Sequence, residues 1–139
     1  MLLIDTSVVV AYYIPESGSP RAQQLFDQDE PLAICSLTEV EFASAMSKLV
    51  RIKALTTVDA RGALDQFNRH VDERYYAFVP LDQPVYAMAQ KWIALMATPL
   101  RTLDAIQLAA AHLYTDGLIT ADKTLVQSGK RLQVDARLL

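Results

Sequence analysis

The sequence predicts an α/β protein in which helices cover both faces of a parallel sheet. Two observations support this fold class. The chain opens with Met1-Leu2-Leu3-Ile4-Asp5, and an unbroken apolar run of this kind is typical of a strand that is buried on both faces. Similar short apolar runs then alternate with longer segments of helical periodicity, which is the pattern of α/β layer folds.

The first third of the chain supplies two strands and two helices. Residues 6–13 are rich in β-branched side chains, but Thr6 or Ser7 is a good helix cap directly after a strand, so we predict a short helix here. Residues 15–20 have the Pro, Ser and Gly content of a turn, and residues 22–28 form a helix that ends before an acidic turn. Residues 32–35 are the second buried strand.

The middle of the chain is mainly helical. A helix opens at Ser36, and its apolar side chains follow helical spacing at Val40, Ala43, Met46, Leu49 and Val50. A second helix runs from about Val58 to Glu73 after a cap at Thr56 or Thr57. Residues 76–80 form a third strand. Asp82 then begins a helix whose expected core positions are Val85, Met88, Ala89, Trp92, Ile93 and Met96.

The last third contains the most apolar helix, predicted over residues 103–113 and expected to be central. Asp116-Gly117 ends this helix, residues 118–120 form a fourth strand, and residues 122–127 form a short helix. Residues 132–135 are expected to be a last edge strand. No internal repeat or linker interrupts the pattern, so we predict a single domain over residues 1–139.

Composition narrows the function classes. With 139 residues, 52% of them hydrophobic, the chain can bury a sizeable core. Its apolar stretches are shorter than the roughly 20 residues of a membrane span, and it opens without a signal segment, so we expect a cytoplasmic protein without a membrane partner. The lone Cys35 cannot form an intrachain disulfide. A net charge of −3 argues against a broad cationic face for duplex DNA.

Four acids arrive at the starts of predicted helices or the ends of predicted strands. Asp5 ends the first strand, Asp122 follows the fourth, and Asp104 and Glu41 lie in the first turns of helices. Each has a structural explanation: Asp5 and Asp122 as helix caps, Asp104 as a partner of a helix dipole, and Glu41 in a capping box with Thr38. These explanations stay open for each acid taken singly.

Taken together, the acids predict a cation site. Two like charges about 4 Å apart cost on the order of 4 kcal/mol at an effective dielectric constant near 20, so clustered carboxylates must take up protons or a cation. Oxygen ligands favour Mg²⁺ or Mn²⁺, and His70 and His112 lack the spacing of zinc ligands. A cation held by carboxylates suits phosphoryl chemistry, because it can activate water and stabilise the leaving oxygen.

Hydroxyl side chains stand next to these acids. Thr6, Ser7 and Thr120 can hydrogen-bond the carboxylates or a bound water and so orient them, and helix capping is the equal alternative for each.

Four segments, in this order and spacing, resemble the PIN-domain ribonucleases and most closely the VapC-type toxins of toxin–antitoxin pairs. The segments are Leu3-Ile4-Asp5-Thr6-Ser7, Ser36-Leu37-Thr38-Glu39-Val40-Glu41, Leu103-Asp104-Ala105-Ile106-Gln107-Leu108-Ala109 and Leu118-Ile119-Thr120-Ala121-Asp122. The resemblance spans the whole chain. It implies a three-layer α/β/α sandwich with a mostly parallel central sheet.

The resemblance also implies a site and an activity. Asp5, Glu41, Asp104 and Asp122 match the acidic positions, while Glu39 should point to a different side of its helix. The implied protein is an endoribonuclease that uses Mg²⁺ or Mn²⁺, forms a homodimer and is inhibited by a cognate antitoxin. Asp5, Asp104 and Asp122 would bind the principal cation, and Glu41 would bind a second ion or position the attacking water.

Basic and apolar side chains suggest where partners bind. Cations that can line an approach for RNA are Arg21, Arg51, Lys53, Arg101, Lys123, Lys130 and Arg131. Apolar side chains in excess of one helical face lie at Tyr12, Tyr13, Phe42, Met46 and Leu49. Either a dimer or antitoxin interface or simple core packing explains this second group.

Three other functions remain open. The chain can be a solitary RNA-processing nuclease of the same type, or a binding module that keeps only the PIN-like fold. An aspartyl phosphotransfer domain with Asp5 as nucleophile is disfavoured, because position 7 is Ser rather than a second acid and no lysine follows a late strand.

Overall fold

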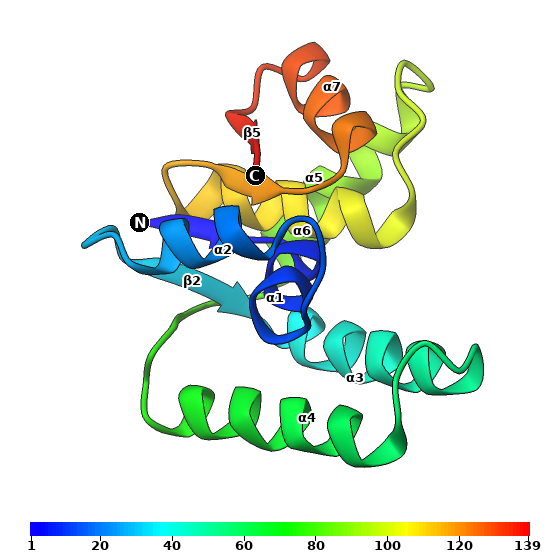
Figure 1. Cartoon of the computed structure of the whole chain (residues 1–139). Coiled ribbons are helices and arrows are strands. Elements are labelled where there is room, and N and C mark those ends of the chain that lie inside the picture. Colours follow the sequence, from blue (N-terminus) through cyan, green and yellow to red (C-terminus); the bar gives the residue numbers. More distant parts are fainter.

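The structure, a computed structural model, describes all residues 1–139 and contains five strands and seven helices. In chain order the elements are β1 Leu2–Ile4, α1 Thr6–Tyr13, α2 Ser19–Phe26, β2 Leu32–Cys35, α3 Ser36–Arg51, α4 Thr57–Asp72, β3 Ala77–Val79, α5 Gln83–Ala94, α6 Thr102–Tyr114, β4 Leu118–Thr120, α7 Lys123–Arg131 and β5 Ala136–Leu138 (Figure 1).

The five strands form one sheet in the order β3-β2-β1-β4-β5, and every neighbouring pair is parallel. The chain passes from β1 to β2 on one side of β1, and β4 lies on its other side. The order therefore reverses between β1 and β4. In open α/β sheets, ligands bind beyond the carboxyl ends of the strands at such a reversal.

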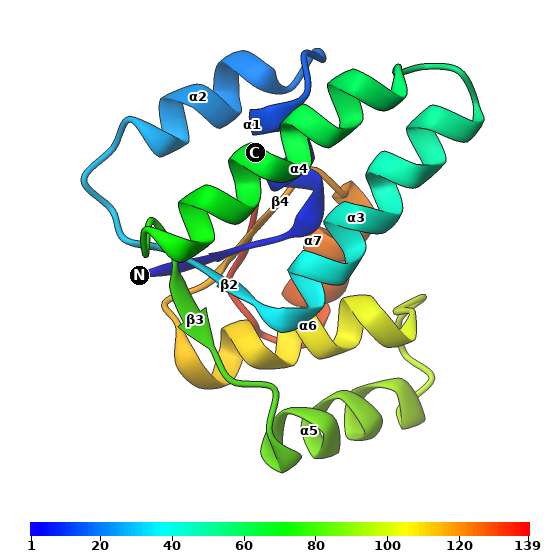
Figure 2. The ribbon, with the colours of Figure 1, turned by 90° about the horizontal axis from the view of Figure 1, so that it is seen from below.

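Helices cover both faces of the sheet, which confirms the three-layer α/β/α sandwich. One face of the sheet packs on α1 to α4, where the buried side chains include Leu2, Ile4 and Phe42. The other face packs on α5, α6 and α7, where they include Leu3 and Leu108. Figure 2 shows the sheet between these two groups of helices. Alternate residues of β1 thus enter opposite layers, as the pleat of a strand requires.

The last strand lies further along the chain than residues 132–135, so that prediction is wrong in position. Helix α7 continues through Gly129 to Arg131 instead of ending at residue 127. Gly129 is needed there, because a Cβ atom would lie 2.7 Å from that of Ala136. Gln133 then turns the chain with a positive φ of 59°, and residues 136–138 pair with β4 at the edge of the sheet.

The start of α2 and the buried face of α3 also differ from the predictions. Helix α2 begins at Ser19, because Pro20 occupies its first turn, where proline is tolerated. In α3 the buried face runs through Thr38, Phe42 and Met46, while Val40 is 68% exposed.

Two apolar side chains that were expected in the core are exposed, while others that were assigned either to an interface or to the core pack inside. In the α5 region, Ile93 and Met96 are exposed, and Met96 lies beyond the helix end. Phe42 and Met46 are fully buried, and Tyr12 and Tyr13 pack against the same core. Core packing therefore explains Phe42 and Met46 in full, whereas Tyr12, Tyr13 and Leu49 are only partly buried against that core.

Candidate active site

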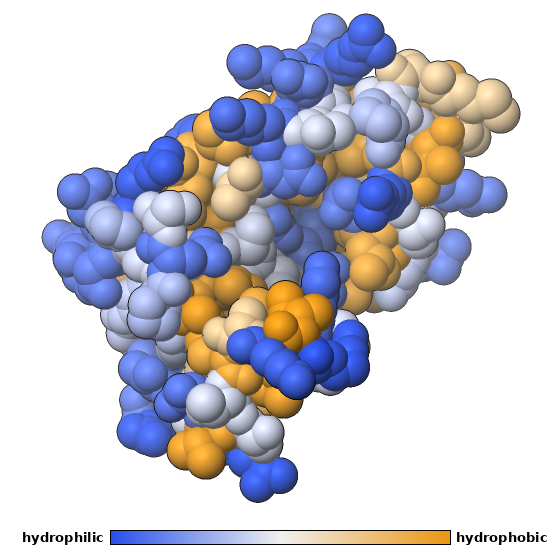
Figure 3. Space-filling view, turned by 45° about the vertical axis from the view of Figure 1, so that its right-hand side comes forward, coloured by the Kyte–Doolittle hydropathy of each residue, from blue (hydrophilic) through white to orange (hydrophobic).

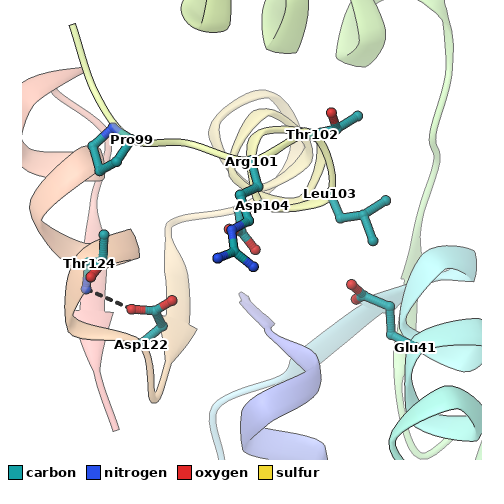
Figure 4. Close-up of a pocket in the computed structure, with 8 residues that line it drawn as sticks. All are labelled: Glu41, Pro99, Arg101, Thr102, Leu103, Asp104, Asp122 and Thr124. Carbon is teal, nitrogen blue, oxygen red and sulfur yellow. Dashed lines mark hydrogen bonds between the residues drawn. The ribbon is translucent and has the colours of Figure 1, made fainter.

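An open cavity of about 690 Å³ lies beyond the carboxyl ends of β1 and β4. Its lining residues are Glu41, Pro99, Arg101, Thr102, Leu103, Asp104, Asp122 and Thr124. Figure 4 shows Asp104 between Asp122 on one side and Glu41 on the other. Figure 3 shows a hollow with a hydrophilic floor on one face of the molecule. The fold therefore gathers carboxylates from α3, α6 and the β4–α7 connection around one cavity.

Asp5 directly follows β1 and occupies the N-cap position of α1, but its side chain makes no capping hydrogen bond. Its Oδ2 atom instead accepts hydrogen bonds from Ser7 Oγ at 2.6 Å and from Thr120 Oγ1 at 2.8 Å. Helix capping thus fails to explain the Asp5 carboxylate. Two hydroxyl groups, from the first turn of α1 and from the end of β4, fix its orientation, and its Oδ1 atom has no hydrogen bond from the chain.

Asp122 caps helix α7, as the structural explanation predicted. Its Oδ1 atom accepts from the backbone amides of Thr124 at 2.7 Å and Leu125 at 3.3 Å (Figure 4). Its own amide donates to the buried Thr120 Oγ1 at 3.0 Å. Capping uses only one carboxylate oxygen, so Oδ2 stays available at the cavity.

Glu41 lies in the second turn of α3 and does not close a capping box, because Cys35 and Thr38 form that box. Its Oε2 atom accepts hydrogen bonds from Thr6 Oγ1 at 2.6 Å and from the side-chain amide of Gln107. Burial raises the pKa of the Glu41 carboxyl, and the nearby charge of Asp5 raises it further, against the lowering effect of these hydrogen bonds.

Asp104 lies in the first turn of α6, which begins directly after Arg101. Burial raises the pKa of the Asp104 carboxyl, and the charges of Asp5 and Asp122 add to this rise, while the Arg101 guanidinium opposes it. Asp104 is thus electrostatically coupled to acids from two strand ends. This mutual repulsion indicates a site with an excess of negative charge.

The four carboxylates suit a hard cation in their chemistry but do not form a finished binding site. The structure contains no group of three His, Cys, Asp or Glu side chains arranged to hold a metal ion. One oxygen of Asp5, of Glu41 and of Asp122 is held by the chain, and the other is available. All the atoms available to bind a metal are carboxylate oxygens, which Mg²⁺ and Mn²⁺ prefer as ligands.

Gln107 is the site residue to which the sequence patterns assigned no role. It lies within an otherwise apolar buried stretch from Ala105 to Ala111 and is 2% exposed. Its amide donates to Glu41 Oε2 and, at 3.4 Å, to Thr6 Oγ1, so it joins three helices beneath the cavity. Its own Oε1 atom is buried without a partner. A lone amide inside an alanine-rich helix was the signal for this residue.

The predicted basic approach is only partly present. Arg101 lines the acidic cavity. Arg21 and Lys123 line a neighbouring pocket beside α2 and the end of β5. Lys53 lies at a separate pocket near the α3–α4 connection. The cation at the acidic cavity therefore comes from the start of α6, and those of the neighbouring pocket come from α2 and α7.

Comparisons with known proteins agree with this architecture. A sequence model of the PIN domain matches residues 2–130. One similar solved structure is that of VapBC2 from Rickettsia felis bound to a promoter DNA fragment. The matching chain is 14% identical with a TM-score of 0.69, and the match covers 99% of this chain and 98% of that chain. No curated protein matches the sequence.

Two further solved structures have the same fold. For FitAcB from Neisseria gonorrhoeae the identity is 17%, the coverage is 98% of this chain and 96% of that chain, and the TM-score is 0.70. For a toxin–antitoxin complex from Klebsiella pneumoniae the identity is 22%, the match covers 91% of this chain and 90% of that chain, and the TM-score is 0.61. At such identities the likeness establishes the fold.

Proposed function

The chain belongs to the PIN-domain family, and we propose that it is a metal-dependent endoribonuclease that acts as the toxin of a toxin–antitoxin pair. The observation that carries this proposal is the meeting of Glu41, Asp104 and Asp122 around one cavity at the sheet reversal, with Asp5 coupled to them. Such an excess of carboxylates favours phosphodiester hydrolysis with a divalent cation over binding of a neutral ligand.

In this proposal Asp5, Asp104 and Asp122 hold the principal cation, and Glu41 holds a second ion or positions the attacking water. A bound Mg²⁺ or Mn²⁺ would supply activation of water and neutralise charge on the phosphate. Thr6, acting with Gln107, fixes the Glu41 carboxylate through the hydrogen bonds described above.

Asp5 is oriented in the same way by hydroxyl groups. Ser7 and Thr120 both donate to Oδ2, and Thr120 also accepts the Asp122 amide. One threonine thereby sets the positions of two proposed ligands, which is the usual task of residues behind a metal site.

Arg101 is the cation placed to receive the substrate. It lines the cavity at the start of α6, and its charge lowers the pKa of Asp104. A guanidinium group binds phosphate through two parallel N–H groups. We assign Arg101 to the phosphate at the scissile bond, where it offsets the repulsion between RNA and the acids.

The proposed partners are a cognate antitoxin and a second copy of the chain, in the cytoplasm. Solved complexes with this fold include toxin–antitoxin assemblies. An acidic cavity of this kind can accept a basic side chain of an inhibitor, which would displace the cation. Exposed apolar side chains suited to a dimer interface are Val40, Tyr86, Ile93 and Leu103. No helix of the structure is long and apolar enough to cross a membrane.

Incubation of the purified protein with total bacterial RNA tests the nuclease proposal. We expect new 5′ and 3′ ends in the presence of Mg²⁺ or Mn²⁺ and none in EDTA. Growth arrest on expression, relieved by a gene encoded beside it, would support the toxin role. RNA cleavage without growth arrest would instead favour a solitary RNA-processing nuclease.

A further inference from the structure

A second, smaller cavity adjoins the acidic one. It has a volume of about 140 Å³ and is lined by Pro99, Thr124, Gln127, Ser128 and Arg131. Pro99 and Thr124 line both cavities, so they form the boundary between the two. Figure 4 shows these two residues on the Asp122 side of the acidic cavity. A molecule bound in the small cavity would therefore lie next to a molecule bound in the acidic cavity.

The chemistry of the small cavity is the reverse of that of the acidic one. No hydrophobic or acidic side chain lines it, and four of its five residues carry a hydrogen-bond donor. Its one charged residue is Arg131. A concave site that offers donors and a positive charge is complementary to an anion with several oxygen atoms.

Ser128 provides an independent indication of a ligand. Its side chain is 2% exposed, lines the cavity, and its Oγ atom has no hydrogen-bond partner. A buried hydroxyl without a partner costs about 1–3 kcal/mol, and rotation of the Ser128 side chain toward the cavity would let its hydroxyl pair with a ligand there.

Arg131 is held in place by the chain. Its Nη1 atom donates to the carbonyl oxygen of Ala97 at 2.6 Å, which ties the end of α7 to the loop before Pro99. A guanidinium group has five N–H donors, so this contact leaves others for a ligand. Because this contact already restricts the Arg131 side chain, phosphate binding costs little further side-chain conformational entropy.

We propose that this cavity is a subsite for a second phosphate of the RNA backbone, adjacent to the scissile phosphodiester. The proposal rests on the proposed nuclease function for the identity of the substrate. Arg131 binds the phosphate oxygens, and Ser128, Thr124 and Gln127 donate to them. The subsite holds the chain in register beside the acids without contacting a base, so it contributes affinity for any sequence.

Titration of the isotope-labelled full chain with inorganic phosphate, followed by amide chemical shifts without added metal, tests the subsite apart from catalysis. We expect saturable shifts at Thr124, Gln127 and Ser128. Arg131→Gln should weaken this binding at least tenfold and Ser128→Ala about threefold. Lys91→Gln is the matched control, since Lys91 is exposed on α5 and lies outside both cavities, and it should change the affinity less than twofold.

The amide spectrum of each variant shows whether it is folded, and Ser128→Ala keeps the contact between Arg131 and Ala97. Shifts that are absent from these three residues, or equal in Arg131→Gln and the wild type, would overturn the subsite. If the wild type binds phosphate here but cleaves no RNA, the nuclease function fails and the subsite stands. If it cleaves RNA but Arg131→Gln matches it in kcat/KM, only the subsite fails.

Discussion

The side-chain amide of Gln107 donates a hydrogen bond to Oε2 of Glu41 and so joins helix α6 to helix α3 beneath the acidic cavity. This contact holds one carboxylate oxygen in place while the other remains available. It also lowers the pKa of Glu41, which burial and the neighbouring acids raise. Gln107 therefore tunes both the position and the charge of a proposed catalytic group.

Replacement of Gln107 by Leu keeps most of the side-chain volume and removes this contact. We expect RNA cleavage to fall about tenfold, equivalent to about 1.4 kcal/mol. The acidic limb of the pH–rate profile should also move to higher pH, because Glu41 loses a hydrogen bond to its charged form. Gln90→Leu, at an exposed position of α5, is the control. A wild-type rate and pH profile for Gln107→Leu would remove Gln107 from the site.

Thr120→Val tests the hydroxyl that links two of the acids. The substitution removes the bond to Asp5 and leaves the Asp122 amide without its acceptor. We expect a loss of about 1–3 kcal/mol in the free energy of unfolding and roughly 10–100-fold weaker metal binding. Calorimetric Mn²⁺ titration and urea unfolding measure the two effects. Thr57→Val, exposed at the start of α4, should leave both unchanged, and equal Mn²⁺ affinities in the two variants would contradict this role.

The pH dependence of stability follows from Glu41 and Asp104. Both carboxyls have raised pKa values in the folded chain, so without metal the folded state binds protons more tightly than the unfolded state. Their contribution to stability is complete below the ordinary values of 4.5 and 3.8 and is lost as pH rises through the raised values. At neutral pH the site is therefore a source of instability that a bound cation would relieve.

We accordingly expect Mn²⁺ to raise the melting temperature more at pH 7 than at pH 5, where protons compete for the same oxygens. At a concentration 100 times the Kd, the gain at pH 7 is about 2.7 kcal/mol. Thermal unfolding with and without Mn²⁺ at the two pH values measures it, with EDTA as the control. Equal gains at both pH values, or none at either, would argue against a carboxylate site.

The fold was largely predictable because short apolar strands alternate with helices along the chain, and both kinds of segment have local sequence patterns. The four apolar runs of β1 to β4 are each three or four residues long and recur between amphipathic helices, so their strand identity is visible in sequence. Residues 136–138 are Ala, Arg and Leu, and a stretch of three residues is too short for its alternation of polarity to identify a strand. Only their pairing with β4 makes them a strand, which is a tertiary effect that propensity does not report.

The candidate site was predictable to a different degree for each residue. Asp5 and Asp122 follow strands, so sheet topology alone brings them to one edge. The hydrogen bonds that orient Glu41 depend on the angles between α1, α3 and α6, which no spacing encodes. Ser128 and Arg131 line a cavity together with Pro99, which is far away in sequence, so this cavity becomes visible only in three dimensions.

The most direct test of the central claim compares Asp104→Asn with the wild type in metal-dependent RNA cleavage. Asp104 lies between the other acids, and its carboxylate should be a cation ligand that Asn replaces poorly (Figure 4). Asp65→Asn, exposed on α4, is the matched control. Initial rates on total bacterial RNA with Mn²⁺ should fall at least about 100-fold for Asp104→Asn, or about 2.7 kcal/mol, and less than twofold for Asp65→Asn. Cleavage by Asp104→Asn at the wild-type rate, or wild-type cleavage that persists in EDTA, would contradict the account.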